Sequence, residues 1–220
     1  MSLDFYFEFI SFVLSLIFFR HLKNASIVLF VPFLFLTVLI EFIGWCFHFF
    51  QIANKNYWLF NLFTTIELVF YAYLFSINFQ HATLKKIAAY FIPLLIVISI
   101  LNYSYLQGTA HFHTYTLLFG SFFMVIFCCV YLYELIITDG HSETLFKKPF
   151  FWICMGIFLF YLGSVIINSL FEYMLNNNLL SPGNNLYLLI TRALNMVLYS
   201  SFSISFILCN RNKKTYYSPL

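Results

Sequence analysis

Charged side chains are scarce in this sequence. Asp, Glu, Lys and Arg make up only 9% of its 220 residues, whereas hydrophobic residues make up 62%. A soluble domain carries about 25% charged residues, so this chain has too little charge to cover a surface that faces water. The composition excludes a soluble globular, an intrinsically disordered and a nucleic-acid-binding protein.

Cysteine pairs with the spacing of a metal site or a disulfide framework are also missing. The five cysteines all lie within apolar stretches, where a free cysteine usually acts as a small buried hydrophobic side chain. We therefore expect neither a metal nor another cofactor. The five positions are Cys46, Cys128, Cys129, Cys154 and Cys209.

Residues that membrane-embedded enzymes require are missing too. Zinc-dependent membrane hydrolases need an aspartate and several histidines within their spans, and here no histidine lies deeper than His48. The segment around Ser164 lacks the context of a rhomboid-type serine protease. A microbial rhodopsin needs a lysine in its last span, and Arg192 cannot replace it because a guanidinium stays protonated. The sequence predicts a protein without enzymatic activity.

Long apolar runs are what the sequence does contain. A transmembrane helix needs about 20 mostly apolar residues, and seven runs approach or exceed that length. They predict an all-α polytopic membrane protein, a seven-transmembrane-helix bundle in which residues 1–220 form a single transmembrane domain. The predicted spans are 5–20, 25–50, 57–78, 87–106, 113–137, 149–175 and 185–209.

Basic residues gather on one side of this predicted bundle. Only Lys55 lies in a connection on the other side, and the acidic start of the chain lacks the features of a signal peptide. Because basic loops stay in the cytoplasm, we expect the N-terminus outside and the C-terminus inside. The basic residues of that side are Arg20, Lys23, Lys85, Lys86, Lys147, Lys148, Arg211, Lys213 and Lys214.

The third and seventh runs share a weak pattern. A shift of 128 residues places Glu67 on Asn195 and Tyr71 on Tyr199. Parallel repeats of this kind occur in transporters, so the pattern suggests a three-plus-one-plus-three arrangement. The alternative is chance similarity between apolar helices.

Polar residues recur within four of the runs at spacings of three or four, which places each set on one helix face. Ionisable groups inside a bilayer are expensive and usually functional, so we take these sets as candidates for a polar cluster or ligand-binding site. The candidate residues are Glu41, Trp45, His48, Asn61, Thr64, Glu67, Asn168, Glu172, Arg192 and Asn195.

The depth of these residues predicts an outward-facing pocket. Glu41, Glu67 and Arg192 lie about 10–15 Å below the outer surface at 1.5 Å per residue, and Glu8 with His48 would form its mouth. We expect a carboxylate, preferably that of Glu67, to pair with Arg192. The same residues also suit polar contacts that hold helices together, or an ion or proton path.

Two other sets of polar residues are expected to face solvent. His111 and His113 alternate in a short outer connection, which favours a solvated loop over a metal site. Glu134 lies near the inner end of the fifth run, where we expect it to reach the interface. The turn predicted at 176–185, with Pro182 and Gly183, is the last outer connection.

Several segments resemble a group of uncharacterised seven-helix membrane proteins of Bacteroidetes. The resemblance covers most of the chain and implies a bacterial membrane protein in a signalling setting, with no catalytic residues. The segments that carry it are Glu41–Trp45, Trp58–Glu67, Tyr131–Leu135 and Lys148–Ile153.

Three functions remain open from the sequence. The first is a sensor or receptor-like protein of the bacterial inner membrane, which binds a small ligand in the outer pocket and signals through a protein partner. The second is a small-solute or proton-coupled transporter. The third is a structural or accessory subunit of a membrane complex, including one in a defence system. None of them involves nucleic acid, and the sequence leaves the oligomeric state open.

Overall fold

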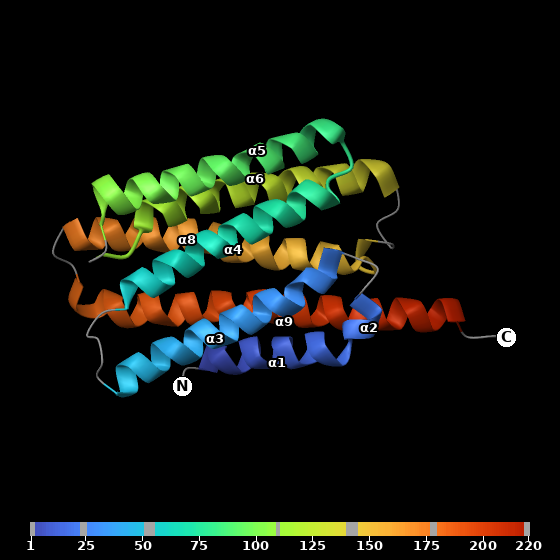
Figure 1. Ribbon diagram of the computed structural model, residues 1–220, viewed down its shortest axis with the longest axis horizontal. Helices are drawn as coiled ribbons and strands as arrows, with labels where there is room; N and C mark the ends of the chain where they lie inside the picture. Colours follow the sequence, from blue (N-terminus) through green and yellow to red (C-terminus); the bar gives the residue numbers. More distant parts are fainter. Residues whose placement is uncertain are drawn as a thin grey trace.

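The structure is a computed structural model that describes residues 3–22, 26–50, 56–108, 111–139, 145–176 and 180–217. Long helices dominate these ranges, as the apolar runs predict, and none of the described residues lies in a strand. Figure 1 shows them as a bundle of rods. The long helices are α1 (Leu3–Ile17), α3 (Phe30–Phe49), α4 (Tyr57–Asn78), α5 (Ala82–Leu101), α6 (Thr114–Asp139), α8 (Pro149–Asn176) and α9 (Leu180–Tyr217).

The described part of the chain contains six helical segments that are long and apolar enough to cross a membrane, which makes it a polytopic helical membrane protein. The seven-span count is not confirmed, because α1 has only 15 residues, or about 22 Å of helix. A turn at Phe18 separates it from the short α2 (Phe19–Leu22). The six segments are Ile27–Phe47, Tyr57–Asn78, Ala82–Leu106, Thr114–Ile137, Pro149–Leu170 and Tyr187–Arg211.

The connection between α8 and α9 is shorter than the sequence indicates. Pro182 and Gly183 predict a turn, but α9 already begins at Leu180. Proline lacks a backbone N–H and is tolerated in the first turn of a helix, where that N–H would have no intrahelical partner. A proline near a helix start was therefore mistaken for a loop signal.

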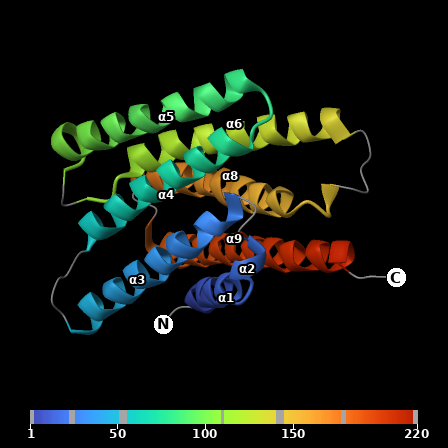
Figure 2. The same ribbon diagram turned by 45° about the vertical axis from the view of Figure 1, so that its right-hand side comes forward.

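The helices alternate in direction, so the connections collect at two ends of the bundle (Figure 1). The start of α1 lies at one end, together with the α3–α4, α5–α6 and α8–α9 connections, and the C-terminus of α9 lies at the other. Figure 2 shows α9 between α8 and α1, and α9 packs against both. The described basic residues of the loops and tail all lie at the C-terminal end: Arg20, Lys85, Lys86, Lys147, Lys148 and Arg211.

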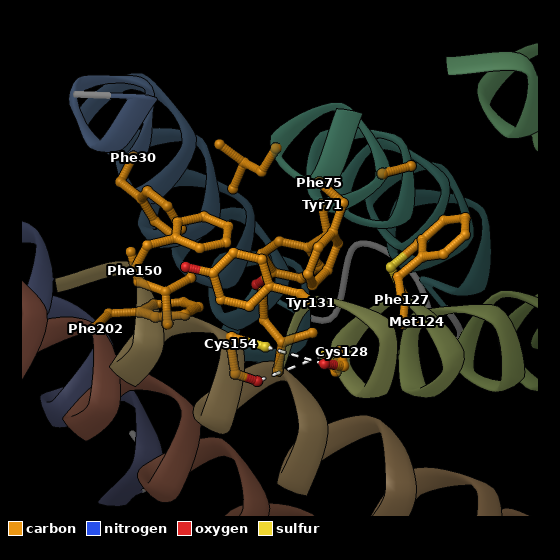
Figure 3. Packing of buried hydrophobic residues seen from close by; sticks show 14 of the residues in the cluster. Phe30, Tyr71, Phe75, Met124, Phe127, Cys128, Tyr131, Phe150, Cys154 and Phe202 are labelled. Atoms are coloured by element: carbon orange, nitrogen blue, oxygen red, sulfur yellow. Dashed lines mark hydrogen bonds between the residues drawn. The ribbon is translucent and has the colours of Figure 1, made fainter. Parts of the chain in front are cut away.

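Aromatic side chains fill the centre of the bundle. Phe30 of α3 is fully buried, and its ring centroid lies 4.8 Å from that of Phe202 and 5.2 Å from that of Phe70. Figure 3 shows the same cluster continuing through Tyr71 and Phe75 of α4. Edge-to-face pairs of this kind add about 0.5–1.5 kcal/mol beyond the area they bury, and here they link α3, α4 and α9.

Two of the cysteines join α6 to α8. The Cys128 thiol donates to the Cys154 carbonyl oxygen at 3.5 Å, and the Cys154 thiol donates to the Cys128 carbonyl oxygen at 3.7 Å (Figure 3). Both residues are buried and reduced, as expected for cysteines that act as small packing residues. Cys129, the next residue, is exposed instead.

Gly156 allows α8 and α9 to approach closely. A Cβ atom added there would lie 2.7 Å from the Cβ of Ser201 and 3.3 Å from the Leu198 carbonyl oxygen. Both atoms belong to rigid parts of α9 and cannot move aside by a side-chain rotation. Small residues at such crossings are a common means of packing helices in membranes.

Substitution of this glycine is expected to weaken the bundle. Gly156→Ala should lower the free energy of unfolding by about 1–2 kcal/mol, because overpacking exceeds the gain in helix propensity. Gly163→Ala on the same helix is the control, since the three atoms nearest to its Cβ all belong to the Leu194 side chain, which can rotate, and not to backbone. Unfolding by SDS titration in mixed micelles measures both. Equal effects of the two substitutions would contradict the role of Gly156.

Candidate functional site

A cavity of about 370 Å³ lies between the helices. Its lining includes Tyr57 at the start of α4, Tyr187 near the start of α9 and Asn168 toward the end of α8. These positions place it in the half of the bundle opposite the basic residues (Figure 1). The volume falls within the range of about 300–1,000 Å³ that small-molecule sites occupy.

Three carboxyl groups from three helices line this cavity: Glu8 of α1, Glu41 of α3 and Glu67 of α4. Glu8 and Glu67 are buried, with exposed fractions of 3% and 8%, whereas Glu41 is half-buried. The Tyr71 hydroxyl donates to Glu67 Oε1 at 3.2 Å from one turn below. The neighbouring helices α3 and α4 thus bring the candidate residues Glu41 and Glu67 to the same cavity.

Amide and hydroxyl groups form the facing wall on α8 and α9. The Tyr187 hydroxyl donates to Asn168 Oδ1 at 3.1 Å, and Asn168 Nδ2 donates to the Ser164 carbonyl oxygen at 2.7 Å. Asn195 Nδ2 donates to Asp4 Oδ2 at 3.4 Å, which ties α9 to the start of α1. This wall therefore combines fixed hydrogen-bonding groups with a fourth carboxylate directly behind it.

Aromatic rings complete the enclosure. They come from α4, α8 and α9 and from the segment before α6, and they leave an apolar surface between the polar groups. The aromatic lining residues are Tyr57, Phe60, Phe63, Phe112, Phe160, Tyr187 and Tyr199.

The expected ion pair of Arg192 is wrong. Arg192 is exposed, and no ion pair within the described residues joins it to Glu41 or Glu67. Thr191 and Asn195 line the cavity instead. Successive helical residues are rotated by about 100°, so a ridge that runs through positions 191, 195 and 199 turns Arg192 away from the cavity.

Other candidates also lie elsewhere. Trp45 is 39% exposed, and its ring stacks on Phe49 at a centroid distance of 5.2 Å on the outer surface of α3. It does not line the cavity, although it lies four residues after Glu41. The side chains of His48 and Glu172 fall outside the described part of the structure.

Asn61 holds a loop rather than facing the cavity. Its Nδ2 donates to the His111 carbonyl oxygen at 2.9 Å, and its Oδ1 accepts from the His113 backbone N–H at 2.9 Å. His113 is 3% exposed, and its Nε2 lies 2.9 Å from the Gly108 carbonyl oxygen. The expectation that His113 belongs to a solvated loop is therefore wrong.

Sequence reasoning missed part of the lining. Tyr187 and Thr191 were not among the candidates, although Tyr187, Thr191, Asn195 and Tyr199 form an unbroken row at spacings of four. Glu8 was placed only at a mouth, yet it is one of the most buried carboxyl groups of the site. The regular row on α9 is a usable signal in the sequence, whereas the charge of Arg192 favours the neighbouring face.

Among the described residues, no group of three or more His, Cys, Asp or Glu side chains has the arrangement of a metal site. Comparisons with models of known protein families, with curated proteins and with solved structures find no match to this chain. The residues of the cavity therefore carry the functional argument alone.

Proposed function

We propose that this protein is a non-enzymatic receptor-like protein of the bacterial inner membrane, with seven spans formed by α1–α2 and the six longer helices. It binds a small ligand in the cavity and signals through a protein partner, since the connections between its spans are too short to hold an output domain. The observation that supports this proposal is the cavity with polar groups and aromatic walls at the end opposite the basic residues. The positive-inside rule turns that end, with the N-terminus, away from the cytoplasm.

The alternative of a proton-coupled or small-solute transporter draws support from the tyrosines below Glu67. Tyr71 and Tyr161 are fully buried, with their ring centroids 5.9 Å apart. The Tyr161 hydroxyl has no hydrogen-bond partner among the described residues. A line of hydroxyls that continues inward from a buried carboxyl suits a carrier, which must open a polar path to both sides.

Cysteine accessibility separates these functions. In a variant without native cysteines, Thr64→Cys places a thiol in the cavity lining, and Ser205→Cys places one in the buried inner half. We expect a membrane-impermeant maleimide to label Thr64→Cys in intact spheroplasts but not in inside-out vesicles, and Ser205→Cys in neither. The physical reason is that the receptor exposes its cavity on one side only.

The other outcomes decide against the receptor. Labelling of Thr64→Cys from both sides indicates the alternating access of a carrier. Labelling from the inside alone reverses the orientation. Absence of labelling on either side, with the denatured protein fully reactive as the control, means that no water-soluble ligand reaches the cavity.

A further inference from the structure

The described ionisable side chains that line the cavity include acidic but no basic residues. Glu8, Glu41 and Glu67 line it, and none of its described lining residues is a lysine, an arginine or a histidine. Asp4 adds a fourth carboxylate behind Asn195. Because Arg192 points elsewhere, the basic side chain that was expected to balance these groups does not do so.

The excess of acidic groups is most pronounced at Glu8. Its side chain lines the cavity at 3% exposure, and its Oε2 is buried without a hydrogen-bond partner among the described residues. An ionised carboxylate in such a place loses its hydration and needs a cation or several donors in exchange. The Glu8 carboxyl group is thus a place for a positively charged group, which the described lining residues do not themselves supply.

The aromatic walls indicate what kind of cation fits. Tyr57, Phe60 and Phe63 line the same space as Glu41 and Glu67. A cation over an aromatic face gains about 0.5–2 kcal/mol, and aromatic enclosures are a common means of recognising alkylammonium groups. The cavity volume of about 370 Å³ leaves room for an organic body attached to the charge.

We propose that the cavity selects small organic ammonium ions, with the charged nitrogen between Glu8 and Glu41 and the carbon skeleton against the aromatic walls. This inference rests on the proposed function and specifies its ligand class. Neutral and anionic molecules of the same shape should bind more weakly, because they bring no positive charge to the carboxyl groups. Specificity therefore comes from charge, and the aromatic surface accepts several skeletons.

The test uses the full chain in lipid nanodiscs and isothermal titration calorimetry. The ammonium probes are tetramethylammonium, 2-phenylethylammonium and 1,4-diaminobutane, and 2-phenylethanol and phenylacetate are the neutral and anionic isosteres of the second. We expect at least one ammonium probe to bind, and its affinity to fall about tenfold or more in Glu8→Gln. Glu8→Asp, which keeps the charge, should lose much less.

A cavity-blocking variant separates this inference from the proposed function. Ser164→Leu fills the lining from α8, and its fold is verified by thermal unfolding without probe. Equal binding of 2-phenylethanol and 2-phenylethylammonium, both abolished by Ser164→Leu, would overturn the ammonium selectivity while the ligand cavity stands. Binding that survives both Ser164→Leu and Glu8→Gln places the probe elsewhere and overturns the selectivity and the cavity together. Absence of binding by every ammonium probe overturns the inference. A binding heat from calcium chloride equal to that of the ammonium probes also overturns it, because the site would then accept any cation.

Discussion

Glu134→Leu is expected to lower the free energy of unfolding by about 3 kcal/mol. The Glu134 side chain is buried in α6, and its two oxygens accept from the backbone N–H groups of Gln80 at 3.1 Å and His81 at 2.9 Å. Hydrogen bonds to a charged group contribute about 1.5–3 kcal/mol each, and the carboxylate also faces the positive end of the α5 dipole. Leucine removes all of these interactions.

The control is Glu134→Gln, which keeps the shape and one acceptor oxygen. It should lose about half as much stability as Glu134→Leu, measured by SDS titration in mixed micelles. Hydrogen exchange of the Gln80 and His81 backbone amides should rise in the same order. An unchanged exchange rate at these two amides in Glu134→Leu would show that the carboxylate does not hold this helix end.

The sequence predicts that Glu134 reaches the membrane interface but gives no sign of its contacts with Gln80 and His81. Apolar length located the helices well, because any long apolar run in a membrane protein must satisfy its backbone as a helix. It could not locate a capping partner that lies 53 residues away in the chain. Such a contact depends on which helices become neighbours, and periodicity within one helix carries no information about that.

The candidate site likewise contains residues that the sequence could place and residues that it could not. Spacing placed Glu41, Glu67, Asn168 and Asn195 among the candidates, and all four line the cavity, since polar faces turn inward in a membrane bundle. It failed for Arg192, which directly follows the lining residue Thr191, and for Trp45, which lies four residues after Glu41. A rotation of about 100° per residue is smaller than the breadth of a polar stripe, so packing against neighbouring helices decides which edge faces the cavity.

Asn61→Leu is the second substitution with a large expected effect, a loss of about 2–3 kcal/mol. It removes both hydrogen bonds to the segment 111–113 and leaves the buried His113 N–H without its acceptor. A buried polar group that loses its partner costs about 1–3 kcal/mol. Leucine matches the volume, so the loss reports the hydrogen bonds and not a new cavity.

Leu62→Ala is the matched control for this substitution. Leu62 is the next residue of α4 and is 53% exposed, so its truncation should change stability little. Limited proteolysis near position 110 should accelerate in Asn61→Leu and stay at the wild-type rate in Leu62→Ala. A similar loss of stability in both variants would contradict the loop-holding role of Asn61.

The polar contacts of α5 have a mechanical consequence for the whole molecule. Besides the Glu134 contacts at its start, Thr65 of α4 donates to Ser99 at 3.3 Å, and Asn102 donates to Thr116 of α6 at 2.8 Å. Hydrogen bonds in a medium without water are costly to break, so α4, α5 and α6 should move as one rigid body.

The opposite flank is attached differently. The bond from Asn195 to Asp4 and the bond from Asn56 to the Gly44 carbonyl oxygen are both 3.4 Å long. An apolar groove runs between α1 and α3 and is lined by aromatic and aliphatic side chains of both helices. Apolar surfaces slide past one another by small shear displacements. A ligand held between Glu8 and Glu41 would therefore act on α1 and α3, and its effect would travel along them toward the end of the bundle where the C-terminus of α9 lies.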